Sequence, residues 1–336
     1  MPTPADKQET GRDFPTPRIV VSKCMGFASC RYNGLTIHSD VVNRLGARSG
    51  VYVEFLPVCP EVAIGLGIPR DPIRIVKLGD ELRLIQPSTK SDFSVQMTEF
   101  AAAHLSSLSD IDGSILKNRS PSCGINDVKI FPDPGSRIPV GKGAGFFGAK
   151  VLEMYPHLPV EDEGRLTNSR IREHFFIRIF TNAFFRRVKA GASMKHLVDF
   201  QRRNKLLLMA YNQKEMRLMG KIIANQEKRP LHQVIENYEQ HLVSAFARPA
   251  RVMSNINVLM HALGYFSKQL SHQEKAFFLD TLEAYRNNKA PLSVPNALLK
   301  SWMVRFNEPY LMQQTFFEPF PPGLIEISDS GKARDY

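Results

Sequence analysis

The sequence predicts an α/β N-terminal domain with a mainly parallel sheet, followed by an all-α C-terminal domain. In residues 18–165, strand-like runs alternate with helix-like segments, a pattern typical of parallel sheets. From about residue 168 onward the segments are all helix-like, and prolines separate several of them. A chain of 336 residues also exceeds one comfortable hydrophobic core, so two domains are expected.

The predicted elements of the first domain are short. Apolar and β-branched runs predict strands at 19–22, 51–55, 73–76, 82–85 and 114–116. Helices are predicted at 40–45, 93–108 and 146–155. In open sheets of this kind ligands bind beyond the carboxyl ends of the strands, so we expect functional residues in the loops that follow them.

The chain beyond residue 168 is predicted to contain helices at 168–188, 197–224, 231–247, 250–269, 272–287 and 295–306. In the fourth of these, Ile256, Leu259 and Leu263 recur at helical spacing. We therefore divide the chain into a disordered lead-in at 1–17, an α/β domain at 18–190, a basic helical domain at 191–320 and a loose tail at 321–336.

The composition fits a folded protein of a reducing compartment. No run of about 18 uncharged apolar residues occurs, so we expect no membrane span. The polar, Pro-rich N-terminus lacks the apolar core of a secretory signal, which favours a cytoplasmic location. Disulfides are then not expected, and the 4 cysteines are free thiols or metal ligands.

The net charge of +11 and the pI near 9.5 suggest a polyanionic partner, usually a nucleic acid. Residues 191–320 hold 17 Lys and Arg against 10 Asp and Glu, so most of the excess lies in the helical domain. The candidate RNA contacts are Lys195, Arg202, Arg203, Lys205, Lys214, Arg217 and Lys221. Positions 202 and 205, and then 214, 217, 221 and 228, recur at helical spacing and suggest one basic face along two helices. The alternative is a solvated helix face, the usual meaning of a charge run.

Three of the cysteines lie in loops that follow strand-like runs. Cys24 follows the run at 19–22, Cys59 stands in Pro-Val-Cys-Pro-Glu, and Cys123 stands in Ser-Pro-Ser-Cys-Gly. These contexts are too rich in Pro, Ser and Gly for core strands, although single buried cysteines are common core residues. Three thiolates from three strand ends can hold a metal centre and leave one coordination position open, as in a catalytic centre. The lack of a Cys-x-x-Cys pair disfavours a zinc finger.

Several separated motifs surround the cysteines. They are Ser-Lys-Cys-Met-Gly at 22–26, Cys-Arg-Tyr-Asn-Gly at 30–34, Val-Cys-Pro-Glu-Val at 58–62 with the segment 65–70, and Leu-Lys-Asn-Arg-Ser-Pro-Ser-Cys-Gly at 116–124. Together, over roughly residues 17–166, they resemble the thiouracil desulfidase family. Asn33 departs from the Asp more usual there, and a turn tolerates either residue. The helical remainder resembles the domain of unknown function found in two-domain members, which look like desulfidases acting on 4-thiouridine in transfer RNA.

The resemblance implies a [4Fe–4S] cluster held by Cys24, Cys59 and Cys123, with one iron free of protein ligands. Cys30 is then left over, and unpaired cysteines are usually small core residues. The resemblance also implies thiolated transfer RNA as the partner, with small thiolated pyrimidines as further candidate substrates.

The chemistry implied by the resemblance is hydrolytic. An iron with an open position is a soft Lewis acid, and it would polarise the C=S bond of a thiocarbonyl for attack by water. Thiouridine and water become uridine and hydrogen sulfide, without a net redox change. The reaction still needs a proton acceptor for the water and a proton donor.

Glu61 is the first candidate for proton transfer because it lies two residues from Cys59. An acidic group next to an anionic cluster is expected to exchange protons near neutrality. The alternative is that Glu61 caps the following turn. Ser120 and Ser122 are the other catalytic candidates, and Ser120 is preferred because Pro121 restricts its backbone. The alternative for both hydroxyls is turn stabilisation.

Other interpretations stay open. Arg31, Lys117 and Arg119 could bind phosphate or balance the charge of a cluster. The Gly-rich segment 65–70 is interpreted as a rigid turn on one wall of the site, since it lacks the Lys-Ser/Thr ending of a phosphate loop. A desulfidase for free thiouracil bases and a non-catalytic RNA-binding protein with a structural zinc are the two alternative functions.

Overall fold

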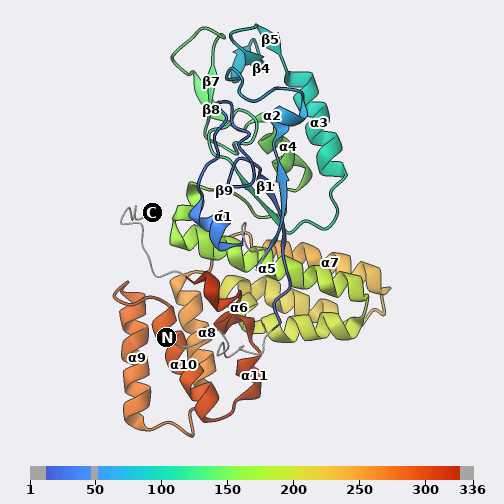
Figure 1. Cartoon of the computed structure of the whole chain (residues 1–336). Helices are drawn as coiled ribbons and strands as arrows, with labels where there is room; N and C mark the ends of the chain where they lie inside the picture. The colour runs from blue at the N-terminus through green and yellow to red at the C-terminus, as the bar shows by residue number, and fades with distance from the viewer. Residues whose placement is uncertain (1–12, 47–51, 326–336) are drawn as a thin grey trace, which may run out of the picture. The chain divides into compact units, whose positions relative to one another are not determined.

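The computed structural model describes residues 13–46 and 52–325 (Figure 1). The chain divides into two compact units, the second of which comprises Phe184–Pro322. The first unit contains two β-sheets and short helices, and the second is helical. The α/β class with a mainly parallel sheet, followed by helices, is therefore confirmed.

The first sheet of unit 1 is parallel throughout and carries the loops of interest. Its strands are β1 (Arg18–Ser22), β2 (Glu54–Val58), β6 (Gly113–Leu116) and β9 (Val160–Asp162), in the order β2-β1-β6-β9. β1 is buried along almost its whole length, as expected for a central parallel strand. The strand predicted at 51–55 is β2, shifted toward the C-terminus, and residue 51 lies outside the described residues.

The second sheet of unit 1 is mixed. Its strands are β3 (Arg74–Leu78), β4 (Glu81–Gln86), β5 (Ser91–Asp92), β7 (Val128–Phe131) and β8 (Gly141–Gly143), in the order β5-β4-β3-β7-β8. Only β3 and β7 pair in parallel. The sequence did not predict β5, β7, β8 or β9. These strands are two to four residues long, and two of them consist largely of glycine or charged residues, so they lack a strand pattern.

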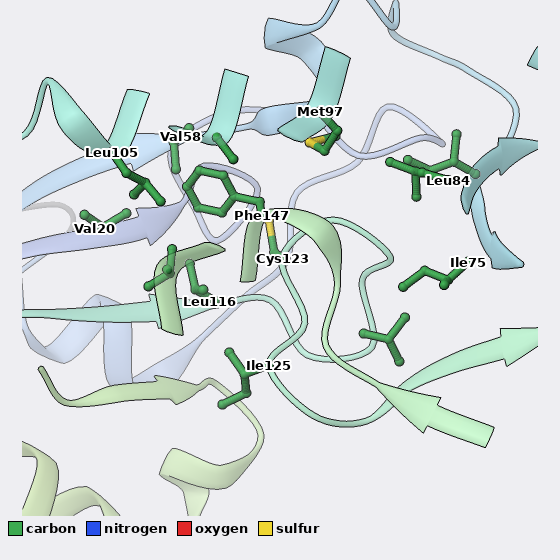
Figure 2. Close-up of a cluster of buried hydrophobic side chains, with 14 of the residues drawn as sticks. Val20, Val58, Ile75, Leu84, Met97, Leu105, Leu116, Cys123, Ile125 and Phe147 are labelled. Carbon is green, nitrogen blue, oxygen red and sulfur yellow. The ribbon is translucent and has the colours of Figure 1, made fainter. Parts of the chain in front are cut away.

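Four short helices precede residue 168 in the described part of the chain. They are α1 (Asp40–Arg44), α2 (Pro60–Ala63), α3 (Ser94–Ser106) and α4 (Phe146–Met154), followed by a 3₁₀ turn at Arg165–Thr167. Helices α3 and α4 share a buried cluster with strands of the parallel sheet. The Phe147 ring of α4 is fully buried in a cluster that also contains Val20, Leu105 and Cys123 (Figure 2). This core fixes the position of α4 against the loop that carries Cys123.

The helices beyond residue 168 are longer. They are α5 (Ser169–Gly191), α6 (Met194–Ala224), α7 (Leu231–Ala245), α8 (Val252–Gly264), α9 (His272–Arg286), α10 (Ser293–Arg305) and α11 (Pro309–Met312), followed by 3₁₀ turns at Thr315–Phe317 and Pro322–Leu324. The helix predicted at 250–269 ends earlier, at Gly264, and α6 has a kink at Asn212, whose φ is −156°. The division between the units falls inside α5.

A buried polar contact fixes the interior of unit 2. The Tyr238 hydroxyl of α7 donates to Gln201 Oε1 of α6 at 2.6 Å, and its ring stacks on Phe185. In the described part of the predicted tail, Leu324 is buried, whereas residues 326–336 lie outside the described residues, as do residues 1–12 of the predicted lead-in. Within the described ranges, every helix is too short or too polar to cross a bilayer.

Candidate active site

All four cysteines of the chain line one cavity of about 400 Å³ in unit 1. This volume lies within the range of small-molecule sites. The wall is built from the loops after three strands of the parallel sheet and from the segment that precedes β3: residues 22–24, 30–32, 58–61, 117–121 and 123, with Arg70, Pro72 and Ile73.

The topology of the parallel sheet brings three of the cysteines together. β2, β1 and β6 are adjacent in the sheet and run in the same direction, so their carboxyl ends meet at one edge. Cys24 lies two residues beyond β1, Cys59 directly follows β2, and Cys123 lies in the loop after β6. The predicted convergence of the three loops is therefore what the structure shows.

Two tight turns present the first two thiols. The Lys23 backbone N–H donates to the carbonyl of Val58 at 2.8 Å, which extends the β1–β2 pairing up to the cysteine loops. Gly26, with φ of +89°, then takes the chain away from Cys24 in a conformation that other residues rarely adopt. Cys59 is the N-cap residue of α2, so its side chain stands at the start of a helical turn.

The Cys123 loop is held by the N-terminus of α4. The first N–H groups of a helix have no partner within it. Here the backbone N–H groups of Gly145, Phe146 and Gly148 donate to carbonyls of residues 121–124 at 2.8 to 3.1 Å. Glycine at two of these positions lets the two backbones approach closely, because a Cβ on Gly148 would lie 2.2 Å from the carbonyl oxygen of Gly124.

Replacing Gly148 by alanine should therefore displace the Cys123 loop. A clash between a new methyl group and backbone atoms in a packed interior lowers the free energy of unfolding by about 1–3 kcal/mol. Denaturant unfolding measures the loss, and Gly141→Ala is the matched control because a Cβ there meets no atom within 4 Å. Equal stabilities of the two variants would contradict this account of the loop.

Burial makes the thiols resist ionisation. Burial and, to a lesser degree, the neighbouring Cys59 raise the pKa of Cys24 to about 11, whereas Lys117 opposes the shift. Burial also raises the pKa of Cys123, and a hydrogen bond from Ser22 lowers it. Cys24 and Cys123 are therefore protonated near neutral pH, and a metal centre bound by these two side chains must displace their protons.

Cys30 is closer to the other thiols than its sequence context suggested. It is buried, lines the same cavity and hydrogen-bonds through its side chain to Cys59. Burial and the Cys59 thiol together raise the pKa of Cys30 to about 12. The Cys59 sulfur also donates to the carbonyl of Cys30 at 3.8 Å. The structure therefore groups four thiols, while the ligand trio remains a prediction.

Glu61 lies in the cavity wall, held by two partners from other loops. Its Oε2 accepts from Arg70 Nε at 2.9 Å and from Arg70 Nη2 at 2.5 Å. Its Oε1 accepts from the Ser122 hydroxyl at 2.9 Å. Only 14% of the Glu61 side chain and 6% of the Arg70 side chain are exposed, so this ion pair is largely shielded from water. Arg70 also donates to the carbonyl of Cys30 at 3.0 Å, which ties the acid to the cysteine loop.

The two candidate serines have different surroundings. Ser120 lines the cavity, and its Oγ accepts from the backbone N–H groups of Ser122 and Cys123 at 3.2 and 3.1 Å, which stabilises the turn. Ser122 is fully buried and bonds Glu61. The sequence favoured Ser120 over Ser122 as the partner in proton transfer. In the structure the hydroxyl that bonds Glu61 is that of Ser122, whereas the bonds of Ser120 Oγ are to backbone N–H groups.

The three cations near the cavity have different partners. Lys117 Nζ pairs with Glu163, and Arg119 Nε lies 3.4 Å from Asp127 Oδ2. The guanidinium of Arg31 lies over the Tyr32 ring, 5.6 Å from its centre. Lys117 and Arg31 both oppose the upward shift in the pKa of Cys24, so they favour its thiolate form. This electrostatic contact supports the charge-balancing interpretation for these two residues.

Sequence reasoning missed two functional neighbours. The sequence places Arg70 in a family motif and a rigid turn, and Ser22 in a family motif and a strand, without a role for either side chain. Arg70 carries the ion pair to Glu61, and Ser22 bonds Cys123 and also accepts from the backbone N–H of Lys117 at 2.9 Å. A polar residue at the last position of a buried strand is the one signal that pointed to Ser22.

The donor set fits an iron–sulfur cluster. Three thiols from separate strand ends face one cavity, and cations adjoin them, as the charge of a thiolate-bound cluster requires. Within the described residues, no three His, Cys, Asp or Glu side chains converge as ligands of a single metal ion. Cysteine thiolates are the usual ligands of iron–sulfur clusters in proteins, so the residue types that line this cavity suit such a group.

All seven candidate RNA contacts of the helical unit lie exposed on α6. Arg202 and Arg203 both pair with Asp199 at 2.7 Å. The other five have no hydrogen bond or ion pair with the residues that the structure describes. The predicted single basic face is divided by the kink at Asn212, so the helical spacing holds only within each half of α6. Lys214, Arg217 and Lys221 share one narrow stripe beyond the kink.

Two families match the chain. The family described as 2-thiouracil desulfurase matches residues 19–163. The family described as "Protein of unknown function (DUF1722)" matches residues 205–321. The chain is 30% identical over 164 residues to "Uncharacterized protein YbgA" of Escherichia coli (strain K12), covering 48% of this chain and 96% of the relative. It is 33% identical over 113 residues to "Uncharacterized protein YbbK" of Bacillus subtilis (strain 168), covering 32% of this chain and 72% of the relative.

A solved structure, "[4Fe-4S]-dependent thiouracil desulfidase TudS", is 29% identical to the chain, with 45% of this chain and 93% of that chain covered and a TM-score of 0.35. The family match at residues 19–163 spans the whole cavity, including the three predicted ligands and Glu61. The chain therefore belongs to the 2-thiouracil desulfurase family and carries a DUF1722 domain after it.

Proposed function

We propose that the protein is a [4Fe–4S]-dependent desulfidase that converts 4-thiouridine in transfer RNA to uridine and hydrogen sulfide. The observation that carries the proposal is the single cavity lined by Cys24, Cys59, Cys123 and Glu61. We assign the three cysteines as cluster ligands. When bound, a cluster with one iron free of protein ligands supplies a soft Lewis acid for the thiocarbonyl sulfur.

The protein groups handle the protons. Glu61 Oε2 accepts two hydrogen bonds from Arg70, whereas Oε1 accepts one from Ser122. Since each carboxylate oxygen has two lone pairs, Oε1 keeps one for a water molecule in the cavity. Glu61 then takes a proton from the attacking water and returns it to the product, while Arg70 and Ser122 hold the carboxylate in place.

The substrate is a macromolecule in this proposal, and α6 supports that choice. Its five cations without partners among the described residues present positive charge to solvent. Phosphate contacts of this kind position a nucleic acid but do not distinguish one base from another. In this proposal the cavity selects the thiolated base. A base that reacts in the cavity must leave its stack, at a cost of a few kcal/mol.

The test is sulfide release by the anaerobically reconstituted full chain. We expect release from transfer RNA that contains 4-thiouridine, with uridine as the nucleoside product. Release from free 2- or 4-thiouracil alone would instead support the free-base desulfidase, whose substrate also suits a cavity of about 400 Å³. A fully loaded cluster protein that releases sulfide from neither substrate would refute the proposal.

Charge reversal on α6 separates the two substrates. Lys214→Glu/Lys221→Glu should weaken binding of thiolated transfer RNA and lower the slope of log affinity against log salt by about 1.4, if each lysine contacts one phosphate of a single strand. Sulfide release from free thiouracil should stay unchanged. Lys268→Glu/Lys289→Glu is the matched control, since these lysines are also exposed and lie in turns of the helical unit outside α6. Equal RNA affinities of the two double variants would show that α6 does not bind RNA.

A further inference from the structure

The second hollow of unit 1 is an open groove of about 450 Å³ beside the cysteine cavity. It is lined by residues of β3, β7 and β8 of the mixed sheet, which neighbour one another in that order. Its charged lining is mainly basic: Arg74, Arg119, Lys129 and Lys142, with Asp127 as the one acid. The desulfidase reaction proposed above uses none of these residues.

The cations of this groove are placed side by side by the strand register. Lys129 of β7 and Lys142 of β8 are directly opposed partners in the antiparallel ladder. Continuing the parallel register of β3 and β7 by one residue sets Arg74 beside Lys129. Like charges that face each other across a ladder are destabilising. Such an arrangement is relieved by an anion bound between them.

The described residues offer these lysines no acidic partner. Both lysines are exposed, and their side chains have no hydrogen bond or ion pair with described residues. The carboxylate of Asp127 accepts hydrogen bonds from the backbone N–H of Arg119 at 3.0 Å and from its Nε at 3.4 Å. Arg74 is oriented by a bond to the carbonyl of Ser136 at 3.0 Å and by the Phe131 ring, whose centre lies 4.9 Å from the guanidinium carbon. The groove therefore keeps a net positive charge.

The groove adjoins the cysteine cavity. Arg119, Pro121 and Ile73 line both of them. A nucleotide whose base enters the cavity can therefore place its phosphate and sugar toward the groove. Neighbouring strands are about 4.8 Å apart, so the three cations on β3, β7 and β8 extend over about 10 Å. This row of cations is longer than one phosphate group, and its length suits successive phosphates along one strand of a nucleic acid.

We infer that this groove binds the phosphodiester backbone next to the thiolated base, so that the α/β unit itself recognises a polynucleotide. The inference rests on the proposed function, in which a thiolated base enters the cysteine cavity. It adds a second phosphate-binding surface, distinct from α6. Lys129 and Lys142 are the main phosphate contacts, with Arg74 beside them.

The test compares Lys129→Glu/Lys142→Glu with the matched control Lys77→Glu/Lys90→Glu in the full chain. The control lysines are exposed on the same unit and lie outside the groove. We expect the groove variant to bind both thiolated and unmodified transfer RNA at least about tenfold more weakly, with the salt slope lowered by about 1.4. Lys129→Gln/Lys142→Gln, which removes the charges without reversing them, should show the same trend and guards against misfolding.

Sulfide release and the affinity for a mononucleotide separate the possible outcomes. Sulfide release from free thiouracil should be equal in the groove and control variants, because the cavity is untouched. Equal RNA affinities, or a wild-type chain that does not bind RNA, would overturn the inference. A loss of affinity for 4-thiouridine monophosphate as large as the loss for RNA would show a site for one phosphate and overturn the polynucleotide assignment. Failure of the wild-type chain to release sulfide defeats the proposed function and leaves the comparison with unmodified RNA intact.

Discussion

Cys24→Ala, Cys59→Ala or Cys123→Ala should each abolish both the visible absorption of a reconstituted cluster and sulfide release. Each thiol comes from a different strand end and lines the same cavity, so no member of the assigned trio can take the place of another. Loss of one of three protein ligands leaves a cluster attached by two. Anaerobic reconstitution, iron and sulfide analysis, and the absorption spectrum measure this outcome.

Cys30→Ala is the matched control for that experiment. It makes the same chemical change in the same cavity, at a thiol that contacts Cys59. We expect it to keep the cluster and the activity. Bleaching by Cys30→Ala would show that the ligand set is wrong and that this fourth thiol holds iron. Thermal unfolding of all four variants separates loss of the cluster from loss of the fold.

Glu61→Gln should lower kcat about a hundredfold to ten-thousandfold and leave the cluster spectrum unchanged. General acid–base catalysis contributes an effect of that size. Glutamine keeps the length of the side chain and an oxygen that can accept from Ser122 or Arg70, but it cannot take up a proton from water. Single-turnover sulfide release by the reconstituted variant measures the chemical step directly.

The buried partner of Glu61 calls for a stability control. Removing one member of a buried ion pair can cost about 3–5 kcal/mol, because Arg70 would remain charged and without a carboxylate. Denaturant unfolding reports that cost separately from kcat. Glu81→Gln is the matched variant, since Glu81 pairs with Arg83 at the exposed surface of the same unit. Retention of full activity by a folded Glu61→Gln protein would reduce Glu61 to a structural role.

Much of the fold followed from local pattern. The buried runs that became β1, β3, β4 and β6 are apolar and β-branched, and the later helices carry regular apolar spacing. The missed strands β7 and β8 lack such a pattern, because they are short and hold glycine and lysine. They exist because they pair with β3 and with each other, and pairing partners are not visible in one segment. The kink at Asn212 was also invisible to helical periodicity.

For the site, the chain alone identified residue types and their loops. Cys24, Cys59 and Cys123 follow strands, and the parallel order of those strands sends all three to one edge, so local sequence was enough to predict a common site. The orientation of Glu61 was different. It depends on Arg70 and on Ser122, which lies 61 residues away, and no local pattern encodes that distance.

The sequence by itself determined the two-part architecture, the cysteine loops and the basic character, since these depend on composition and on short-range periodicity. Only the tertiary structure decided that Cys30 joins the cavity, that Ser122 rather than Ser120 contacts the acid, and that Lys129 faces Lys142 across a ladder. The physical reason is that each of these contacts joins segments far apart in the chain. Their geometry is set by strand register and by packing such as that of α4 against the Cys123 loop, which form only when the whole unit folds.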